Sequence, residues 1–477
     1  MRKPYLVHFG PAKCAVDLCD GSERGEYVNQ DYILTKLGRP HRAINLMYCY
    51  YPNDEGWPLR ASVAHAHDAQ FAWDYPYDDY FPYTGGLGGN HEGPVFAQMR
   101  DIRRHGQDVC LTLTMDPYLS DEHIAAVARD LRTFGRITVR INHEATGSWF
   151  SFNKRASYET VAAFFVRACG VFHREAPNCK VVLCLDGCKE LSEQKMVMEE
   201  IFTEAAKAAD IVSVDRYLAL HWGWPNDVCT DARSAADYDT DEIYKLAKKS
   251  YRRYTVMNDG VKKPMVMSEL NADGDVTGVF YQEEKVKRFC DLVKADREHW
   301  LSGFTMYQFR DRGRLGLEIE DPNNADNGIE QPVLATYKEI IEDPFFAPSR
   351  KAGKSVKLPV TLRYGGAEDF EAVAIPMELS GAPVLFDCYF DGALADANLM
   401  LEINGKWFYK SPKAKVIDLM SAFFEKPLDG EADLKLRIFA PPADGENDLS
   451  IEDGLENAYA TIEKLPKIRI RFAPIEK

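Results

Sequence analysis

The stretch RITVRINHEATGSWFSF, residues 136–152, decides how the rest of the chain is interpreted. Its first seven residues alternate β-branched side chains with polar or charged ones, which is the pattern of a strand. The strand runs directly into His143 and Glu144, and a loop that contains Trp149 follows. A carboxyl group at a strand end must stay solvated or hydrogen-bonded. The pattern favours Glu144 as a catalytic acid/base; the alternative is a rim glutamate beside a core tryptophan.

Length and composition bound the kind of protein that carries this stretch. A chain of 477 residues predicts two or three domains, although one (β/α)8 barrel alone can take about 250 residues. A hydrophobic content of 45%, with 12% aromatic residues, can fill a sizeable core. The formal charge of −16 argues against a nucleic-acid partner, because no excess of Lys and Arg is available to neutralise phosphates.

The distribution of apolar residues and cysteines predicts a compartment. The first residues contain no uninterrupted apolar segment of the secretory type, and no stretch approaches the ~20 apolar residues of a membrane span. Among the eleven cysteines, Cys49, Cys110 and Cys184 fall inside predicted strands, which fits reduced thiols. We therefore expect a cytoplasmic protein without a membrane partner; a mature fragment of a secreted protein is the alternative.

Eight strand-like runs alternate with helical ones along residues 1–347. The predicted strands are residues 5–9, 43–48, 109–115, 136–142, 180–185, 211–214, 264–268 and 303–307. Each strand from the third onward is preceded by an amphipathic stretch of helical period. Regular alternation predicts parallel pairing, and the count of eight favours an α/β fold of the closed (β/α)8 type, a TIM barrel, over an open sheet.

The sequence changes character after residue 347. From about residue 355 to 477, short alternating runs are separated by Gly, Pro and Asp, and helical periodicity nearly disappears. This pattern predicts a C-terminal all-β sandwich domain. Its aromatic run, residues 407–409, can stack on sugar or pack in the core, and we favour the core for alternate residues.

A barrel places its active-site groups at the C-terminal ends of its strands. The predicted strand ends carry polar or aromatic residues, and the strand starts offer nothing comparable: His8, Tyr50, Asp116, His143 with Glu144, Asp186, Asp215 with Tyr217, Glu269, and Tyr307 with Gln308. Two long loops, residues 51–94 and 217–239, are rich in aromatic residues, which suits stacking against the apolar faces of sugar rings. The second loop contributes Trp222 and Trp224.

Two glutamates at the ends of the fourth and seventh predicted strands face one another across the mouth of such a barrel. Glycoside hydrolysis needs two carboxyl groups, and a separation of about 5–5.5 Å gives retention through a covalent intermediate. We expect Glu144 to be the acid, with a raised pKa, and Glu269 to stay ionised. Tyr217 and His143 are candidate hydrogen-bond donors to Glu269, and Arg140 can supply positive charge. This chemistry requires no metal and no organic cofactor.

The eleven residues 140–150, RINHEATGSWF, resemble the Arg-x-x-His-Glu-x-x-Gly-x-Trp-Phe signature of glycoside hydrolase family 26, the β-mannanase family of clan A. The resemblance extends to Asp215 and Tyr217 after the sixth strand and to Glu269 at the end of the seventh. It implies a retaining hydrolase with Glu144 as acid/base and Glu269 as nucleophile. It also implies that His143 and Tyr217 support the nucleophile and that Trp149 forms a sugar-stacking wall.

Two departures from the family pattern leave the sugar open. Thr146 stands where the family usually has Asn, and Tyr307-Gln308-Phe309 stands where the eighth strand often supplies Trp. The expected partner is a β-linked glycan, with β-mannoside first and β-glucan or β-xylan next. A sugar-binding barrel without hydrolysis is the alternative. It would keep Trp149, Trp222 and Trp224 but would not need Glu144 and Glu269 at catalytic separation.

Two segments allow an ion site as an alternative to an ordinary role. His65 and His67, with Asp68, can place two imidazoles on one side of a strand for zinc, although no third His or Cys supports them. Residues 321–328, DPNNADNG, offer oxygen ligands for calcium, but we favour a polar turn.

Overall fold

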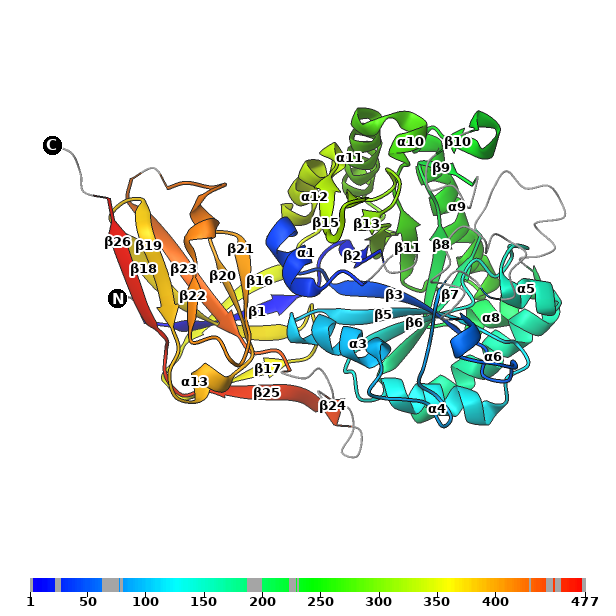
Figure 1. Ribbon diagram of the computed structural model, residues 1–477, viewed down its shortest axis with the longest axis horizontal. Helices are drawn as coiled ribbons and strands as arrows, with labels where there is room; N and C mark the ends of the chain where they lie inside the picture. The colour runs from blue at the N-terminus through cyan, green and yellow to red at the C-terminus, as the bar shows by residue number, and fades with distance from the viewer. Residues whose placement is uncertain are drawn as a thin grey trace.

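The computed structural model describes residues 3–21, 27–61, 77, 80–186, 200–222, 229, 231–428, 430–442, 449–450 and 456–473. A barrel surrounded by helices and a smaller β-sandwich lie side by side (Figure 1). Within these residues no helix is both long and apolar enough to cross a membrane. The segment with His65 and His67 lies outside the described residues, so the zinc alternative stays a prediction.

Eight parallel strands form the barrel. They are β2 (Ala15–Cys19), β3 (Ala43–Tyr50), β5 (Asp108–Met115), β6 (Ile137–Ile141), β7 (Cys179–Leu185), β8 (Ile211–Asp215), β11 (Met265–Leu270) and β12 (Gly303–Met306). The sheet closes because β2 pairs with β12 on one side and with β3 on the other. The predicted (β/α)8 barrel is confirmed.

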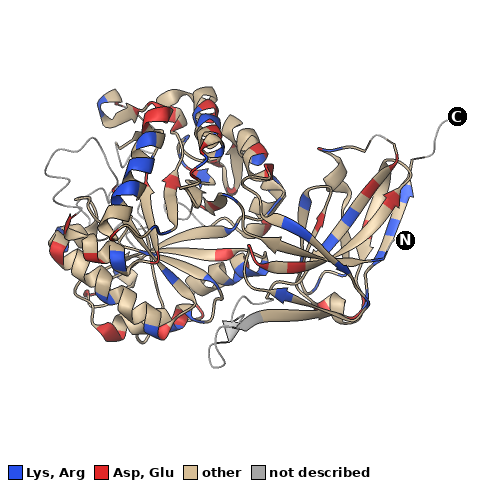
Figure 2. Cartoon of the chain, turned by 180° about the vertical axis from the view of Figure 1, so that it is seen from behind, with Lys and Arg blue, Asp and Glu red and all other residues tan. Residues whose placement is uncertain are grey.

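Helices cover the outside of the barrel. They are α1 (Gln30–Leu37), α3 (Pro94–Arg104), α4 (Asp121–Leu131), α6 (Tyr158–Glu175), α8 (Thr203–Ala208), α9 (Thr240–Met257), α11 (Val279–Ala295) and α12 (Pro332–Glu342). The start of α6 is fixed by Ser157, whose hydroxyl accepts from the backbone N–H of Thr160, and α9 starts in the same way at Asp239. Acidic and basic residues are interspersed on the outer helices (Figure 2). Exposed ion pairs contribute little, so the apolar faces packed on the strands hold these helices.

Shorter elements lie in the connections. They are β4 (Phe81–Pro82), α5 (Ser151–Arg155), β9 (Ala219–His221), η2 (Ala232–Ser234), β10 (Ala235–Asp237), α10 (Gly274–Thr277), β13 (Arg310–Asp311), β14 (Glu318–Asp321) and β15 (Asn324–Glu330). Strands β14 and β15 form a hairpin, and the Asp321 carboxylate accepts from the backbone N–H of Asn323 at 2.8 Å. The favoured polar turn is therefore confirmed for residues 321–324, whereas residues 324–328 belong to strand β15.

The first predicted strand does not belong to the barrel. Strand β1 (Tyr5–Gly10) pairs antiparallel with β16 (Ser349–Ser355) and β18 (Phe370–Leu379) of the sandwich. Placing residues 1–347 in the barrel is therefore wrong for Tyr5–Gly10. His8 lies 3.7 Å from Asp369 of the sandwich, far from its expected place at a barrel strand end.

The C-terminal region folds as the predicted all-β sandwich. Its remaining elements are β17 (Val360–Tyr364), β19 (Pro383–Tyr389), α13 (Ala393–Asp396), β20 (Leu399–Ile403), β21 (Lys406–Lys410), β22 (Val416–Asp418), η3 (Met420–Phe423), β23 (Ala432–Phe439), β24 (Leu449–Ser450), β25 (Glu456–Ile462) and β26 (Lys467–Phe472). One sheet contains β22, β19 and β26, and the larger sheet packs against it. Trp407 is buried against Phe9 and Phe439, as favoured, and Tyr409 packs on His105 of the barrel.

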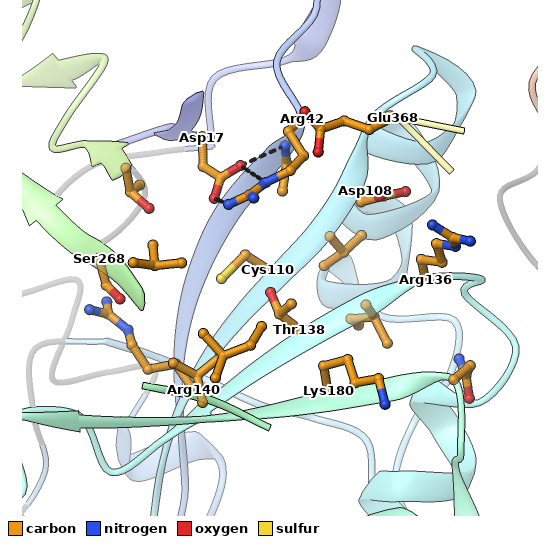
Figure 3. Close-up of a pocket in the computed structure, with 18 of the residues that line it drawn as sticks. Asp17, Arg42, Asp108, Cys110, Arg136, Thr138, Arg140, Lys180, Ser268 and Glu368 are labelled. Carbon is orange, nitrogen blue, oxygen red and sulfur yellow. Dashed lines mark hydrogen bonds and ion pairs between the residues drawn. The ribbon is translucent and has the colours of Figure 1, made fainter. Parts of the chain in front are cut away.

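A cavity of about 460 Å³ occupies the N-terminal end of the barrel, where the sandwich docks. Its walls include short strand side chains, and charged residues surround it, including Glu368 from the turn between β17 and β18 (Figure 3). The labelled charged residues are Asp17, Arg42, Asp108, Arg136, Arg140, Lys180 and Glu368. We expected the strand starts to carry no set of polar residues comparable to the set at the strand ends. The charged residues around this cavity show that this expectation is wrong. Arg140 lines this cavity and also bonds a carboxylate near the C-terminal ends of the strands, so it lies between the cavity and that end of the barrel.

Candidate active site

The C-terminal ends of β6, β8 and β11 bring three carboxyl groups together. Glu144 follows β6, Asp215 is the last residue of β8, and Glu269 lies near the end of β11. Strands β6, β7, β8 and β11 are consecutive neighbours in the sheet, so these ends share one sector of the barrel mouth. Glu269 is 6% exposed and Asp215 2% exposed. Buried acids of this kind require specific partners.

Glu269 has two such partners. The guanidinium Nη2 of Arg140 donates to Glu269 Oε1 at 2.8 Å, and the Tyr217 hydroxyl donates to Oε2 at 2.6 Å. The structure therefore confirms the predicted hydrogen bond from Tyr217 to Glu269 and the predicted positive charge of Arg140 beside it. One cationic and one neutral donor thus fix both oxygens of the Glu269 carboxyl group.

His143 stands beside this carboxylate without a hydrogen bond to it. Its Nε2 is 3.7 Å from Glu269 Oε1, and the same nitrogen hydrogen-bonds to the Tyr80 hydroxyl at 3.1 Å. Burial, together with the nearby charge of Arg140, lowers the pKa of His143 well below its usual range. The ring is therefore neutral at physiological pH and brings no charge to Glu269. The sequence analysis did not identify Tyr80, which lies in the aromatic loop 63 positions earlier.

Arg140 holds a second carboxylate, which the sequence analysis placed at a strand end without a contact. Its Nη1 lies 2.9 and 3.0 Å from the two oxygens of Asp215. The thiol of Cys184 also donates to Asp215, at 3.2 Å. Burial raises the pKa of Asp215 to about 7, against the opposing effect of Arg140. One guanidinium thus serves two acids, and the local charge balance is negative when both are ionised.

Backbone geometry aims Glu144 into this cluster. Asn142 and Glu144 adopt left-handed φ angles of 48° and 50°, which cost non-glycine residues about 1–3 kcal/mol each. Side-chain bonds from Asn142 to both backbone groups of Met115, at 2.6 and 3.2 Å, fix the first of these turns. The Ala145 N–H donates to the carbonyl of Cys184 at 3.1 Å, which ties the turn to β7. Neighbouring strands therefore impose the strained turn.

The Glu144 carboxyl is half-buried, and among the described residues it accepts a side-chain hydrogen bond from Trp149. The indole Nε1 donates to Glu144 Oε2 at 2.9 Å. Burial, followed by the negative charges of Asp215, Glu269 and Asp186, raises the pKa of Glu144 well above its usual range, while the indole bond opposes that rise. A raised pKa favours the protonated carboxyl, which is the form that a general acid uses. The predicted sugar wall, Trp149, is thus also a donor to the acid.

Gly147 leaves the room that this tryptophan needs. A Cβ atom at Gly147 would lie 2.6–2.9 Å from Cζ2, Cε2 and Cη2 of the Trp149 ring, which is closer than packed atoms approach. The Tyr158 hydroxyl also donates to the Gly147 carbonyl at 3.0 Å, which anchors the loop. The Gly-x-Trp spacing in the sequence therefore reflects close packing of the indole over the loop.

The other predicted binding residues surround the carboxyl groups at different depths. Tyr307 is buried, and its ring packs edge-on against Tyr217 with centroids 5.8 Å apart, so it supports a residue that bonds Glu269. Trp222 is 46% exposed on the rim. Trp224 lies outside the described residues.

On the opposite side of the barrel mouth, Arg155 pairs with Asp54 and lies over the Tyr51 ring. Sequence reasoning missed this contact because the partners are about a hundred positions apart.

Three side chains of this cluster also have the spacing of metal ligands. His143, Asp215 and Glu269 each present a ligand atom, all within 4.8 Å of one another. Arg140 already donates to both carboxylates, and its fixed charge opposes a cation at the same point. The residues present therefore fit an acid and a carboxylate better than a metal site.

Comparisons with known proteins give resemblances at low identity. No family model matches the chain, and no curated protein matches it. A glycoside hydrolase family 26 β-mannanase from Bacteroides ovatus is 11% identical, with 70% of this chain and 90% of that chain covered and a TM-score of 0.43. A family 51 α-L-arabinofuranosidase from Bifidobacterium longum is 11% identical, with 91% and 98% covered and a TM-score of 0.43. A glucosidase from Croceicoccus marinus is 8% identical, with 91% and 96% covered and a TM-score of 0.47.

Proposed function

We propose that this protein is a retaining glycoside hydrolase that acts on β-linked oligosaccharides or polysaccharides. A (β/α)8 barrel hosts many chemistries, so the proposal depends on the site and not on the fold. The observation that supports it is the pair of unlike carboxyl groups. Glu144 has a raised pKa and accepts the Trp149 indole bond, whereas Glu269 is held by Arg140 and Tyr217.

In the first step Glu269 attacks the anomeric carbon while Glu144 gives its proton to the leaving glycosidic oxygen. A covalent glycosyl-enzyme forms on Glu269. The negative charge of Glu269 is one cause of the raised pKa of Glu144, so esterification of Glu269 removes that cause. Glu144 then becomes the better base and takes a proton from water, which attacks the anomeric carbon and releases Glu269.

The sugar is proposed on narrower grounds. The motif RINHEATGSWF, residues 140–150, supports a β-mannoside as the first candidate. Thr146 and Tyr307 depart from that family pattern and keep β-glucan and β-xylan as the next candidates. A barrel that binds sugar without hydrolysing it is the outcome to exclude.

The test uses hydrolysis of aryl β-glycosides and of β-mannan, β-glucan and β-xylan oligosaccharides by the full chain. We expect turnover with retained anomeric configuration by NMR, and loss of turnover in Glu144→Ala and Glu269→Ala. Azide should rescue the two variants differently, giving a β-glycosyl azide with Glu144→Ala and an α-glycosyl azide with Glu269→Ala. Glu463→Ala, at an exposed position in the sandwich, is the matched control. Binding of these glycans without turnover by the starting protein would overturn the proposal.

A further inference from the structure

Exposed aromatic side chains of the barrel gather on its catalytic side. Among the described barrel residues, the exposed aromatic ones all follow the C-terminal ends of β5, β8 or β11: Tyr118, Trp222, Tyr238, Phe280 and Tyr281. Trp222 and Tyr238 come after β8, and Phe280 and Tyr281 begin α11 after β11. We call these last four residues the rim strip. Their exposed fractions are 46%, 38%, 68% and 65% in chain order.

Two paired segments connect the rim strip to the catalytic carboxylate. One starts at Tyr217 and leads to Trp222; the other starts at Glu269 and leads to α10 and α11. They run side by side, because the Leu218 N–H donates to the Asn271 carbonyl at 2.7 Å and the Asp273 N–H to the Ala219 carbonyl at 3.0 Å. The strip is thus built on ordered backbone that continues outward from the residues around the nucleophile (β9 and α10 in Figure 1).

Members of the rim strip also lie close to one another across helix and loop. Tyr281 and Lys285 are one turn apart on α11, so their side chains share a helix face. The Lys285 ammonium donates to the carbonyl of Tyr238 at 2.6 Å and pairs with Asp237 at 2.7 Å. Tyr238 and Tyr281 therefore border one patch, with a cation and a carboxylate between them.

The composition of the strip indicates what it binds. Single exposed aromatic residues are ordinary, but four on adjoining rigid elements are not. A protein-docking patch would include exposed aliphatic side chains. The exposed valines that lie between Tyr238 and Phe280 in the sequence are Val256 and Val261. They lie at and beyond the C-terminal end of α9, away from the catalytic end of the barrel. Flat rings beside hydrogen-bonding groups match a pyranose, which has an apolar C–H face and a hydroxyl edge.

We infer that the rim strip binds sugar units of a β-linked chain beyond the units held at Glu144 and Glu269. This inference rests on the proposed function and deepens it: the substrate is a chain long enough to reach the strip, and cleavage occurs within that chain. Short glycosides occupy only the part of the site beside Glu144 and Glu269 and do not touch Phe280 or Tyr281.

The test compares the full chain with a Phe280→Ala/Tyr281→Ala double variant. On oligosaccharides of increasing length, kcat/KM should fall about tenfold or more for the longest substrates and stay within twofold for an aryl monoglycoside. Phe424→Ala removes an equally exposed aromatic side chain, 71% exposed, from the sandwich and should change neither. Equal loss on short and long substrates, or no loss on long ones, would overturn the inference.

A binding measurement keeps this test independent of turnover. Native gels cast with soluble β-mannan, β-glucan or β-xylan should retard the starting protein and the Phe424→Ala variant, and retard the double variant much less. If the starting protein hydrolyses nothing but is retarded through the strip, the proposed hydrolase fails while the glycan surface stands. If no polysaccharide retards the starting protein more than it retards the double variant, the inference that the rim strip binds glycan is overturned.

Discussion

Replacing Gly147 by alanine should weaken the acid through a single methyl group. The new Cβ would lie 2.6 Å from the Trp149 ring, whereas ordinary contact begins at 3.4 Å, so the ring must move by about 0.8 Å. That displacement exceeds the slack between the 2.9 Å indole bond to Glu144 and the ~3.2 Å upper limit for such bonds. Loss of a buried hydrogen bond costs about 1–2 kcal/mol, which corresponds to a decrease in kcat/KM of roughly 5–30-fold.

The same change should move the pH profile in a defined direction. The indole bond lowers the pKa of Glu144, so losing it raises that pKa further. Because the acid works in its protonated form, the alkaline limb of kcat/KM should shift to higher pH. The assay is the pH dependence of kcat/KM on an activated aryl β-glycoside.

Two further variants separate this effect from general damage. Trp149→Phe removes the three ring atoms that the methyl group would meet, so adding Gly147→Ala to Trp149→Phe should cost nothing more. Gly170→Ala, in helix α6 with nothing within 4 Å of the added Cβ, should leave activity unchanged. Full activity in Gly147→Ala with an unaltered pH profile, or the same loss in both backgrounds, would refute the packing argument.

Three other changes test the charge cluster. Tyr217→Phe removes the 2.6 Å bond to Glu269 and should lower kcat/KM about 10–100-fold with little change in melting temperature. Arg140→Met leaves Asp215 and Glu269 buried without their cation and should lower the free energy of unfolding in urea by about 3–5 kcal/mol; a loss below 1 kcal/mol would contradict this. Burial raises the pKa of Asp215 to about 7, above the ~3.9 of an unfolded chain, so the folded state holds the proton more tightly and stability falls as pH rises from about 4 to 7. Asp215→Asn should flatten that slope in urea titrations at pH 4.5 and 7.5, and an unchanged slope would assign it to another group.

Much of the barrel could be predicted because seven of its strands are buried runs of normal length. The first strand escaped detection for a physical reason. Strand β2 has a charged residue, Asp17, in its middle, and two bonds from Arg42 satisfy that charge. Residues 5–9 show clearer alternation, but alternation indicates a sheet with one exposed face, whereas barrel strands are covered on both faces. The periodicity thus belonged to the sandwich.

The candidate site was predictable where its residues are close in the chain or follow strand ends. Arg140, Glu144 and Trp149 lie within ten residues, and Glu269 ends a recognisable strand. The bond between His143 and Tyr80 was not predictable, because it depends on how a long loop folds back over the barrel. The double role of Arg140 was also not predictable, because it depends on how the closed barrel brings β8 and β11, with which β6 does not pair, within reach of β6.

The pairing of β1 with β16 and β18 has a consequence during synthesis. Phe9 leaves the ribosome about 340 positions before its partner Arg350, a delay of tens of seconds at ~5–20 residues per second. Throughout that interval the apolar Leu6, Val7 and Phe9 lack their strand partners in β16 and β18. A nascent chain stalled before residue 349 would carry β1 as an unpaired strand, which can associate with other chains. We therefore expect a chaperone to bind this N-terminal segment during synthesis.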